Sequence, residues 1–147
     1  MDASELGVEQ ARENARLNGL EDKVSFVCAD VFDFLPALEE KGEKFDVVIL
    51  DPPAFTKSGS TVKNAIRGYK EINLKAMKLL PRGGYLATCS CSHFMKEEYF
   101  VQMLKDAAKD ASVSLRQIEA RQQAPDHPVL WNVPETYYLK FYIFQVV

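Results

Sequence analysis

The sequence is poor in the residues from which metal sites, disulfide frameworks and phosphate-binding loops are built. Its 147 residues include 2 histidines, 3 cysteines and 7 glycines. The histidines lack a metal-ligand spacing, so no metal site is expected. No apolar stretch reaches the ~18 residues of a membrane span. The first residues are acidic and polar, so we expect no signal peptide and no membrane partner.

The cysteines and the net charge narrow the range of functions. Cys89 and Cys91 flank a single residue of an expected strand and are poorly placed for a disulfide, so a reducing, cytoplasmic compartment is favoured. A net charge of −3, with 47% hydrophobic and 27% charged residues, fits one soluble globular domain. This charge argues against a generally basic nucleic-acid binder, so affinity for RNA would need a local patch or another domain.

Helical and strand-like hydrophobic periodicities alternate along the chain. We expect helices at residues 4–18, 31–40, 61–80 and 96–111, and strands at 24–29, 45–50, 85–90, 113–121 and 137–147. Ser4 is the expected N-cap of the first helix, which Asn18-Gly19 ends. This alternation implies an α/β fold with a mostly parallel, doubly wound sheet. The last two strands are joined without a helix, which predicts an antiparallel hairpin at one edge.

The apolar faces of three helices can be read from the same spacing. The first helix is expected to bury Leu6, Val8, Ala11 and Ala15. The long third helix presents Val62, Ile66, Tyr69, Ala76, Met77 and Leu80 on one side, and the fourth presents Tyr99, Phe100, Met103, Leu104, Ala107 and Ala108. These faces predict where the helices pack on the sheet.

Two short motifs follow expected strands. The motif Asp51-Pro52-Pro53-Ala54-Phe55 comes directly after the strand at 45–50, and a Ser-Cys-Ser motif ends the strand at 85–90. Loops beyond the carboxyl ends of parallel strands form the ligand crevice of open α/β sheets. The sequence therefore predicts a carboxylate and a thiol in one cleft, a combination that suggests methylation of a nucleic-acid base at carbon.

Several further motifs carry a resemblance to a known family. They are Asp2-x-Ser4 with Asn14 and Asn18-Gly19, Asp30-Val31-Phe32, Arg67-Gly68-Tyr69-Lys70-x-Ile72-Asn73, Ser90-Cys91-Ser92, Asp126-His127-Pro128 and Pro134-Glu135-x-x-Tyr138-Leu139-Lys140. Together with the acid-Pro-Pro motif, they resemble the bacterial 23S ribosomal RNA cytosine-C5 methyltransferases. Members of that family are class I enzymes that use S-adenosyl-L-methionine and carry an N-terminal PUA domain.

The resemblance implies a domain organisation. Residues 1–147 would be part of a Rossmann-like methyltransferase domain, N-terminally truncated, without the first strands and the Gly-rich cofactor loop. The seven glycines include no G-x-G-x-x-G. Without those strands, the segments 24–29 and 45–50 would present unpaired edges. We expect them to pair directly or to be covered by a second copy, so a homodimer is a predicted partner state.

The resemblance also implies roles for the residues of the cleft. Cys91 would be the nucleophile that adds to C6 of cytosine, because a thiolate there makes C5 nucleophilic. Asp51 would orient the base, and Cys89 would be a small buried hydrophobe. An inert Cys91 in the core and a rigid turn at Asp51 are the structural alternatives.

S-Adenosyl-L-methionine is the implied cofactor. Asp2 would hold its ribose hydroxyls and Asp30 its adenine amine, with Val31 bordering the ring. Asp51 and Pro52 would also lie against the cofactor. An Asp before a helix is often an N-cap, and for Asp30 this role is compatible with cofactor binding.

Ribosomal RNA is the implied substrate. Pro53 and Phe55 would contact the base, with Phe55 stacked on it, and His127 would lie beside the active site unless its role is structural. A cationic cluster would either meet phosphates or form a solvated helix face. Its members are Lys57, Lys63, Arg67 and Lys70.

Two other functions stay open. Asp-Pro-Pro-aromatic turns also occur in enzymes that methylate exocyclic amines of bases, and Cys91 would be dispensable for that reaction. The second is a truncated, non-catalytic fragment, which the absence of a Gly-rich loop favours.

Overall fold

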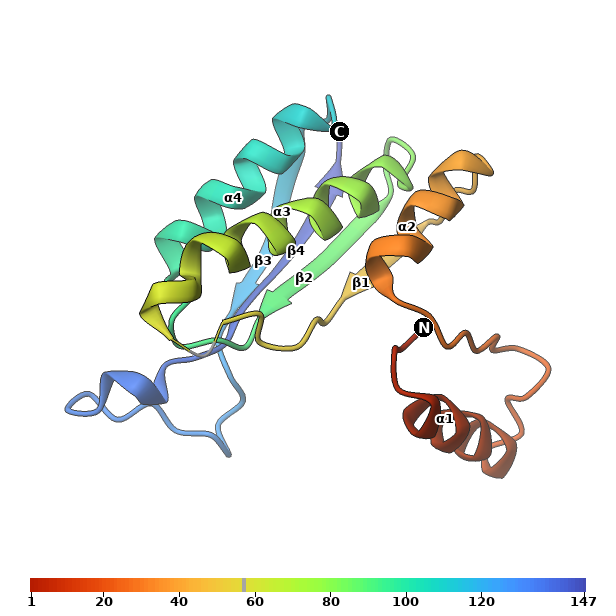
Figure 1. Cartoon of the computed structure of the whole chain (residues 1–147), viewed down its shortest axis with the longest axis horizontal. Coiled ribbons are helices and arrows are strands. Elements are labelled where there is room, and N and C mark those ends of the chain that lie inside the picture. The colour runs from red at the N-terminus through yellow and green to blue at the C-terminus, as the bar shows by residue number, and fades with distance from the viewer. Residues whose placement is uncertain (57) are drawn as a thin grey trace. The chain divides into compact units, whose positions relative to one another are not determined.

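The structure is a computed structural model that describes residues 1–56 and 58–147. Lys57, one of the expected cationic residues, lies outside the described residues. The chain divides into two compact units, Met1–Lys41 and Gly42–Val147. Figure 1 labels the helices and strands of both units, and each unit is described by itself. Among the described residues, no helix is both long and apolar enough to cross a membrane.

The first unit contains two capped helices, as the sequence predicts. Helix α1 covers Glu5–Leu17, and the Ser4 hydroxyl accepts a hydrogen bond from Gly7 N at 3.1 Å. Helix α2 covers Val31–Glu40 and is capped by Asp30. On α1, Val8 and Ala15 are buried, but Leu6 is 72% exposed, so its expected place on the buried face is wrong.

The expected strand at residues 24–29 is not formed. A single parallel bridge joins Cys28 to Asp2, where Asp2 N donates to Val27 O and Ala29 N donates to Asp2 O. A strand needs a neighbour along its length to satisfy its backbone groups, and here the pairing extends over one residue of that neighbour. The β-prone composition of the segment therefore yields an extended stretch with one bridge.

The second unit is built on a four-stranded sheet in the order β1-β2-β4-β3. The strands cover Val47–Leu50 (β1), Tyr85–Ser90 (β2), Leu115–Arg121 (β3) and Lys140–Val146 (β4). β1 and β2 are parallel, whereas β4 runs antiparallel to both of its neighbours, β2 and β3. β1, β2 and β3 therefore share one direction, which confirms the mostly parallel sheet with an antiparallel hairpin at its edge.

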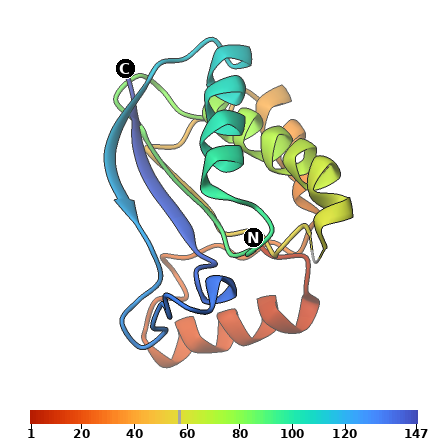
Figure 2. The ribbon, with the colours of Figure 1, turned by 90° about the vertical axis from the view of Figure 1, so that its left-hand side faces the viewer.

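Helices α3 (Val62–Lys78) and α4 (Glu97–Asp110) lie on the same face of this sheet (Figure 2). Short 3₁₀ turns lie at Gly59–Thr61 and Pro134–Thr136. The helices pack on each other and on the sheet through most of the positions that their periodicity predicts. Val62 and Ile66, however, are only half-buried, and Tyr99 is exposed, so their expected burial is wrong. The buried helical residues are Ala65, Tyr69, Ile72, Asn73, Ala76 and Met77 on α3, and Phe100, Met103, Leu104, Ala107 and Ala108 on α4.

The turn between α3 and β2 is fixed by its glycines. Gly83 has a φ of 91°, a conformation that side chains with a Cβ rarely adopt. At Gly84 an added Cβ would lie 3.0 Å from the Pro81 carbonyl oxygen. The turn therefore ends the helix and feeds the chain directly into β2, as the sequence predicts.

Strand β1 forms an open edge of the sheet. It begins at Val47 rather than at Phe45, because Phe45 N donates to the Leu79 carbonyl at the end of α3. Val47 and Ile49 are 54% and 69% exposed, and β2 is the one strand that pairs with β1 in the described part of the chain. Covering of this edge by a second copy stays a prediction.

Replacing Tyr69 by Phe should destabilise the second unit. Tyr69 is fully buried, its ring packs against Phe100, and its hydroxyl accepts a hydrogen bond from Ser90 Oγ at 3.0 Å. Loss of that acceptor should lower the free energy of unfolding by about 1–2 kcal/mol in urea denaturation followed by circular dichroism. Tyr99→Phe, at a 41% exposed position, is the matched control. Equal midpoints for the two variants would contradict this account.

Candidate active site

The in-register pairing of β1 with β2 brings the two motifs together. Leu50 is paired with Thr88, so Asp51 and Cys89 follow on adjacent strands. Cys89 Sγ lies 3.1 Å from Asp51 Oδ1, to which it donates. Cys91 Sγ lies 4.0 Å from the Pro52 carbonyl oxygen. The structure thus places a carboxylate and two thiols at the carboxyl ends of two parallel strands.

The two thiols differ in their surroundings. Cys89 is 6% exposed, and burial, followed by its bond to Asp51, raises the pKa of Cys89 to about 12. It therefore stays protonated near neutral pH and serves as a hydrogen-bond donor to the carboxylate. Cys91 lies one pleat further out, just beyond the end of β2, and is half-buried. The accessible thiol is the one that the sequence predicts.

Buried hydroxyl groups fix the loops after β1 and β2 to each other. Ser92 Oγ donates to the carbonyl oxygen of Thr56 at 2.9 Å, and both residues are buried. The ring of Phe55 lies 4.7 Å from the ring of Tyr69, tilted by 52°. Phe55, the expected stacking residue, thus rests on Tyr69 and is half-buried.

Lys140 is the residue of this site that the sequence did not reveal. It is 2% exposed, and its Nζ donates to the carbonyl oxygens of Ser92 at 2.6 Å and Tyr138 at 2.7 Å. Burial lowers the pKa of Lys140 to about 8, although electrostatic interactions with Cys91 and Glu97 oppose this shift. The lysine belongs to a motif that the sequence singles out, but nothing in its spacing indicates burial.

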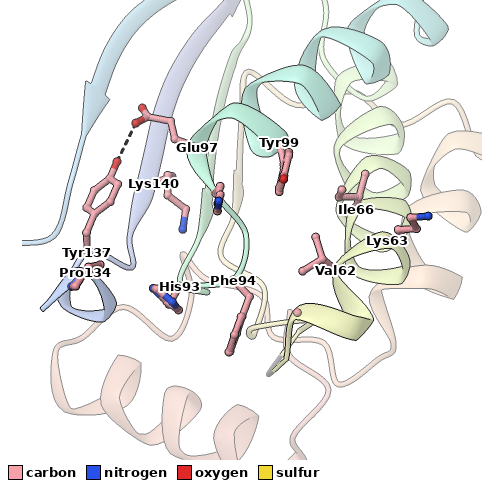
Figure 3. Close-up of a pocket in the computed structure, with 12 residues that line it drawn as sticks. Val62, Lys63, Ile66, His93, Phe94, Glu97, Tyr99, Pro134, Tyr137 and Lys140 are labelled. Carbon is pink, nitrogen blue, oxygen red and sulfur yellow. Dashed lines mark hydrogen bonds between the residues drawn. The ribbon is translucent and has the colours of Figure 1, made fainter.

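A pocket of about 640 Å³ opens beside these loops (Figure 3). Glu97 on its wall accepts hydrogen bonds from the hydroxyls of Tyr137, at 3.0 Å, and Tyr142. Burial, reinforced by these bonds, raises the pKa of both tyrosines, so both hydroxyls stay protonated and donate. The pocket is lined by Gly59, Val62, Lys63, Ile66, His93, Phe94, Lys96, Glu97, Tyr99, Pro134, Tyr137 and Lys140.

The remaining expected substrate residues lie on α3 and in the loop before β4. Arg67 is exposed on α3, whereas the Lys70 ammonium forms an ion pair of 2.6 Å with Asp110. His127 is exposed, with its Nδ1 3.2 Å from Asp126 Oδ1. Pro53 is exposed in the loop after β1. The Lys70 ammonium is thus held by a carboxylate, and the phosphate contacts of Arg67 and Lys70 stay predictions.

In the first unit, the bridge between Asp2 and Cys28 sets two exposed carboxylates in neighbouring segments. Asp2 Oδ1 accepts from Ser4 N at 2.7 Å, and Asp30 Oδ1 accepts from Phe32 N at 2.8 Å. The N-cap role of Asp30 is thereby confirmed. Val31 is half-buried at the start of α2. These hydrogen bonds involve only the Oδ1 atoms of Asp2 and Asp30.

Comparison with known proteins gives the family. A family described as "Methyltransferase domain" matches residues 1–135. The chain belongs to this methyltransferase family. It is 45% identical over 141 residues to "Ribosomal RNA large subunit methyltransferase I" of Aeromonas salmonicida, covering 95% of this chain and 36% of that protein. The protein of the same name from Salmonella arizonae is 45% identical over 148 residues, which cover 100% of this chain and 37% of that protein.

Solved structures show the same methyltransferase fold. The structure of SMU.776 complexed with SAH has a TM-score of 0.80 at 17% identity and covers 98% of this chain and 37% of that one. An O-methyltransferase from Bacillus cereus in complex with SAH has a TM-score of 0.59 at 20% identity. The match covers 99% of this chain and 60% of that one. The Rossmann-like fold class is therefore confirmed. The chain spans a little more than a third of the curated relatives it matches.

The surroundings of the cysteines predict their order of alkylation. At pH 8, iodoacetamide should modify exposed Cys28 and half-buried Cys91, while Cys89 stays unmodified because it is buried and its pKa is raised to about 12. Peptide mass spectrometry measures the three sites separately. Labelling in urea, where Cys89 becomes accessible, is the control. Native labelling of Cys89 at the rate of Cys28 would refute this description.

Proposed function

We propose that this chain is part of a cytoplasmic, S-adenosyl-L-methionine-dependent methyltransferase that forms 5-methylcytosine in 23S ribosomal RNA. The observation that carries the proposal is the accessible Cys91 thiol beside the loop of Asp51 and Pro52. The relatives named ribosomal RNA large subunit methyltransferase I support ribosomal RNA as the substrate.

Cys91 supplies the nucleophile. Its thiolate forms a bond to C6 of the cytosine, and the electron pair of the C5–C6 double bond makes C5 nucleophilic. After C5 has been methylated, its proton leaves to a base, the double bond re-forms, and the sulfur departs as a thiolate. Cys91 lies just beyond the end of β2 and is half-buried, so its thiol is partly accessible to a base.

Asp51 orients the target base. Its exposed carboxylate suits the N3 or exocyclic amine of cytosine, and the two following prolines limit the conformations of its loop. The bond from Cys89 to Oδ1 fixes one oxygen and leaves the second for the base. Pro53 and Phe55 border the base in this proposal, and Arg67 meets a phosphate of the RNA.

The cofactor is held by the exposed carboxylates of the first unit. Each has an oxygen outside the bonds described above, and carboxylates suit the ribose hydroxyls at Asp2 and the adenine amine at Asp30. Val31, half-buried at the start of α2, borders the adenine in this proposal. When bound, S-adenosyl-L-methionine supplies an electrophilic methyl group on its sulfonium.

A covalent trap tests the role of Cys91. In the whole gene product, RNA that contains 5-fluorocytosine should form a stable adduct, because fluorine at C5 prevents the proton loss that precedes elimination. Cys91→Ala should abolish the adduct, which is detected by denaturing electrophoresis. Cys89→Ala, the matched control, should largely retain it, since Cys89 is buried and protonated.

The outcomes of this trap separate the alternatives. An adduct that survives Cys91→Ala would remove Cys91 from the mechanism. Methyl transfer that persists in Cys91→Ala, without any adduct, would indicate methylation of an exocyclic amine. Absence of both adduct and methyl transfer in the unsubstituted protein would indicate that the protein is non-catalytic.

Calorimetry separates the two carboxylates. Asp30→Ala should weaken binding of S-adenosyl-L-methionine by about 1–3 kcal/mol, because the adenine amine would lose a hydrogen bond to a charged group. Asp30→Ser keeps an N-cap residue for α2 and should lose the same affinity, which distinguishes cofactor binding from helix capping. Asp51→Ala should lower turnover with little change in affinity. A loss of affinity in Asp51→Ala and a loss of turnover alone in Asp30→Ala would show that the two roles proposed here are wrong.

A further inference from the structure

The pocket in Figure 3 has a composition that the reaction at Cys91 does not require. Its volume of about 640 Å³ lies within the ~300–1,000 Å³ of small-molecule sites. Three apolar positions that helical periodicity assigns to the core, Val62, Ile66 and Tyr99, line it instead. Apolar side chains kept on the wall of an open pocket indicate a surface for an apolar or aromatic ligand group.

The pocket is also positively charged within an acidic chain. Three lysines line it, at positions 63, 96 and 140, against a single carboxylate, Glu97, although the chain as a whole carries a net charge of −3. That carboxylate is already bound by two tyrosine hydroxyls. Lys140 has no ion pair with a carboxylate within the described residues, and its two hydrogen bonds use two of its three N–H donors. Burying a charge in this way is costly unless an anion compensates it.

Aromatic rings stand at the same opening. Two hydrogen bonds fix the turn after Ser92. The Ser92 carbonyl oxygen accepts them from Met95 N at 3.1 Å and from Lys140 Nζ at 2.6 Å. Met95 is fully buried, while Phe94 is 38% exposed. In Figure 3, Lys140 enters from the β4 side and Val62 from the α3 side. Proteins that bind single-stranded nucleic acid stack bases on exposed aromatic rings and attract phosphates with positive charge. Phe94 and Lys140 supply such a pair here.

We propose that this pocket holds one nucleotide of the RNA next to the target base, with its base stacked on Phe94 and Tyr99 and its phosphate drawn by Lys140 and Lys96. The proposal rests on the proposed function in taking RNA as the substrate. Phe94 lies three residues after Cys91 in the same loop. A base at Cys91 and its neighbour in the pocket would therefore be read by one short segment, which gives the enzyme a preference for the flanking nucleotide.

Nuclear magnetic resonance titration of the chain tests the pocket directly. The probe is inosine 5′-monophosphate, whose purine lacks the amine expected to contact Asp30. It should shift the amide signals of His93, Phe94 and Glu97. Phe94→Ala and Lys140→Met should each raise its dissociation constant about fivefold or more, since stacking and phosphate attraction are separate contributions. Lys105→Met, at an exposed position of α4, is the matched control and should change it less than twofold.

Two further titrations decide the ligand class. Inosine should bind more weakly than its monophosphate, and Lys140→Met should reduce that difference, because Lys96 still faces the phosphate. Equal shifts by inorganic phosphate alone would overturn the proposal in favour of a simple anion site. Absent shifts, or affinity unchanged in Phe94→Ala, would overturn it as well. The result is independent of covalent trapping at Cys91, so loss of trapping with intact pocket binding would refute the cytosine chemistry and leave the nucleotide site standing.

Discussion

The parallel pairing of β1 with β2 is the constraint on which the candidate active site depends. Its register sets Asp51 beside Cys89, and the next pleat places Cys91 beside the Pro52 carbonyl. A slip by one residue would turn every side chain of β1 to the opposite face. The buried bonds from Ser92 to Thr56 and from Ser90 to Tyr69 act on the same region, so sheet register and loop geometry are determined together.

Much of this arrangement follows from local sequence patterns. The strand at 85–90 and the two capped helices of the first unit are where the sequence places them. The difference between Cys89 and Cys91 also follows, because alternate residues of a strand share a face and the second thiol lies beyond the last paired residue. The expected strand at residues 24–29 does not form, because local patterns alone do not determine a strand. The β-propensity of these residues is local, whereas a strand needs a neighbour that only tertiary structure supplies.

The residues missed by sequence reasoning are those whose role depends on strand order. Lys140 is buried because β4 lies between β2 and β3, which sets it opposite Ser90. Nothing local to Lys140 reveals that neighbour. Similarly, helical periodicity identifies Val62, Ile66 and Tyr99 as members of apolar faces, but it does not show where the core ends and the pocket begins. In both cases the sequence does not show whether a side chain is buried in the core or lines the pocket.

The inserted position of β4 has a consequence for biosynthesis. β4 is made after β3 but lies between β3 and β2, so those two strands have no common neighbour until residues 140–146 have left the ribosome. Until then, Ser92 also lacks the ammonium that fixes its carbonyl oxygen. Such non-local pairing folds slowly. The loop that carries the accessible thiol would thus be fixed only after β4 has paired, so a nascent chain that lacks β4 does not present a finished site.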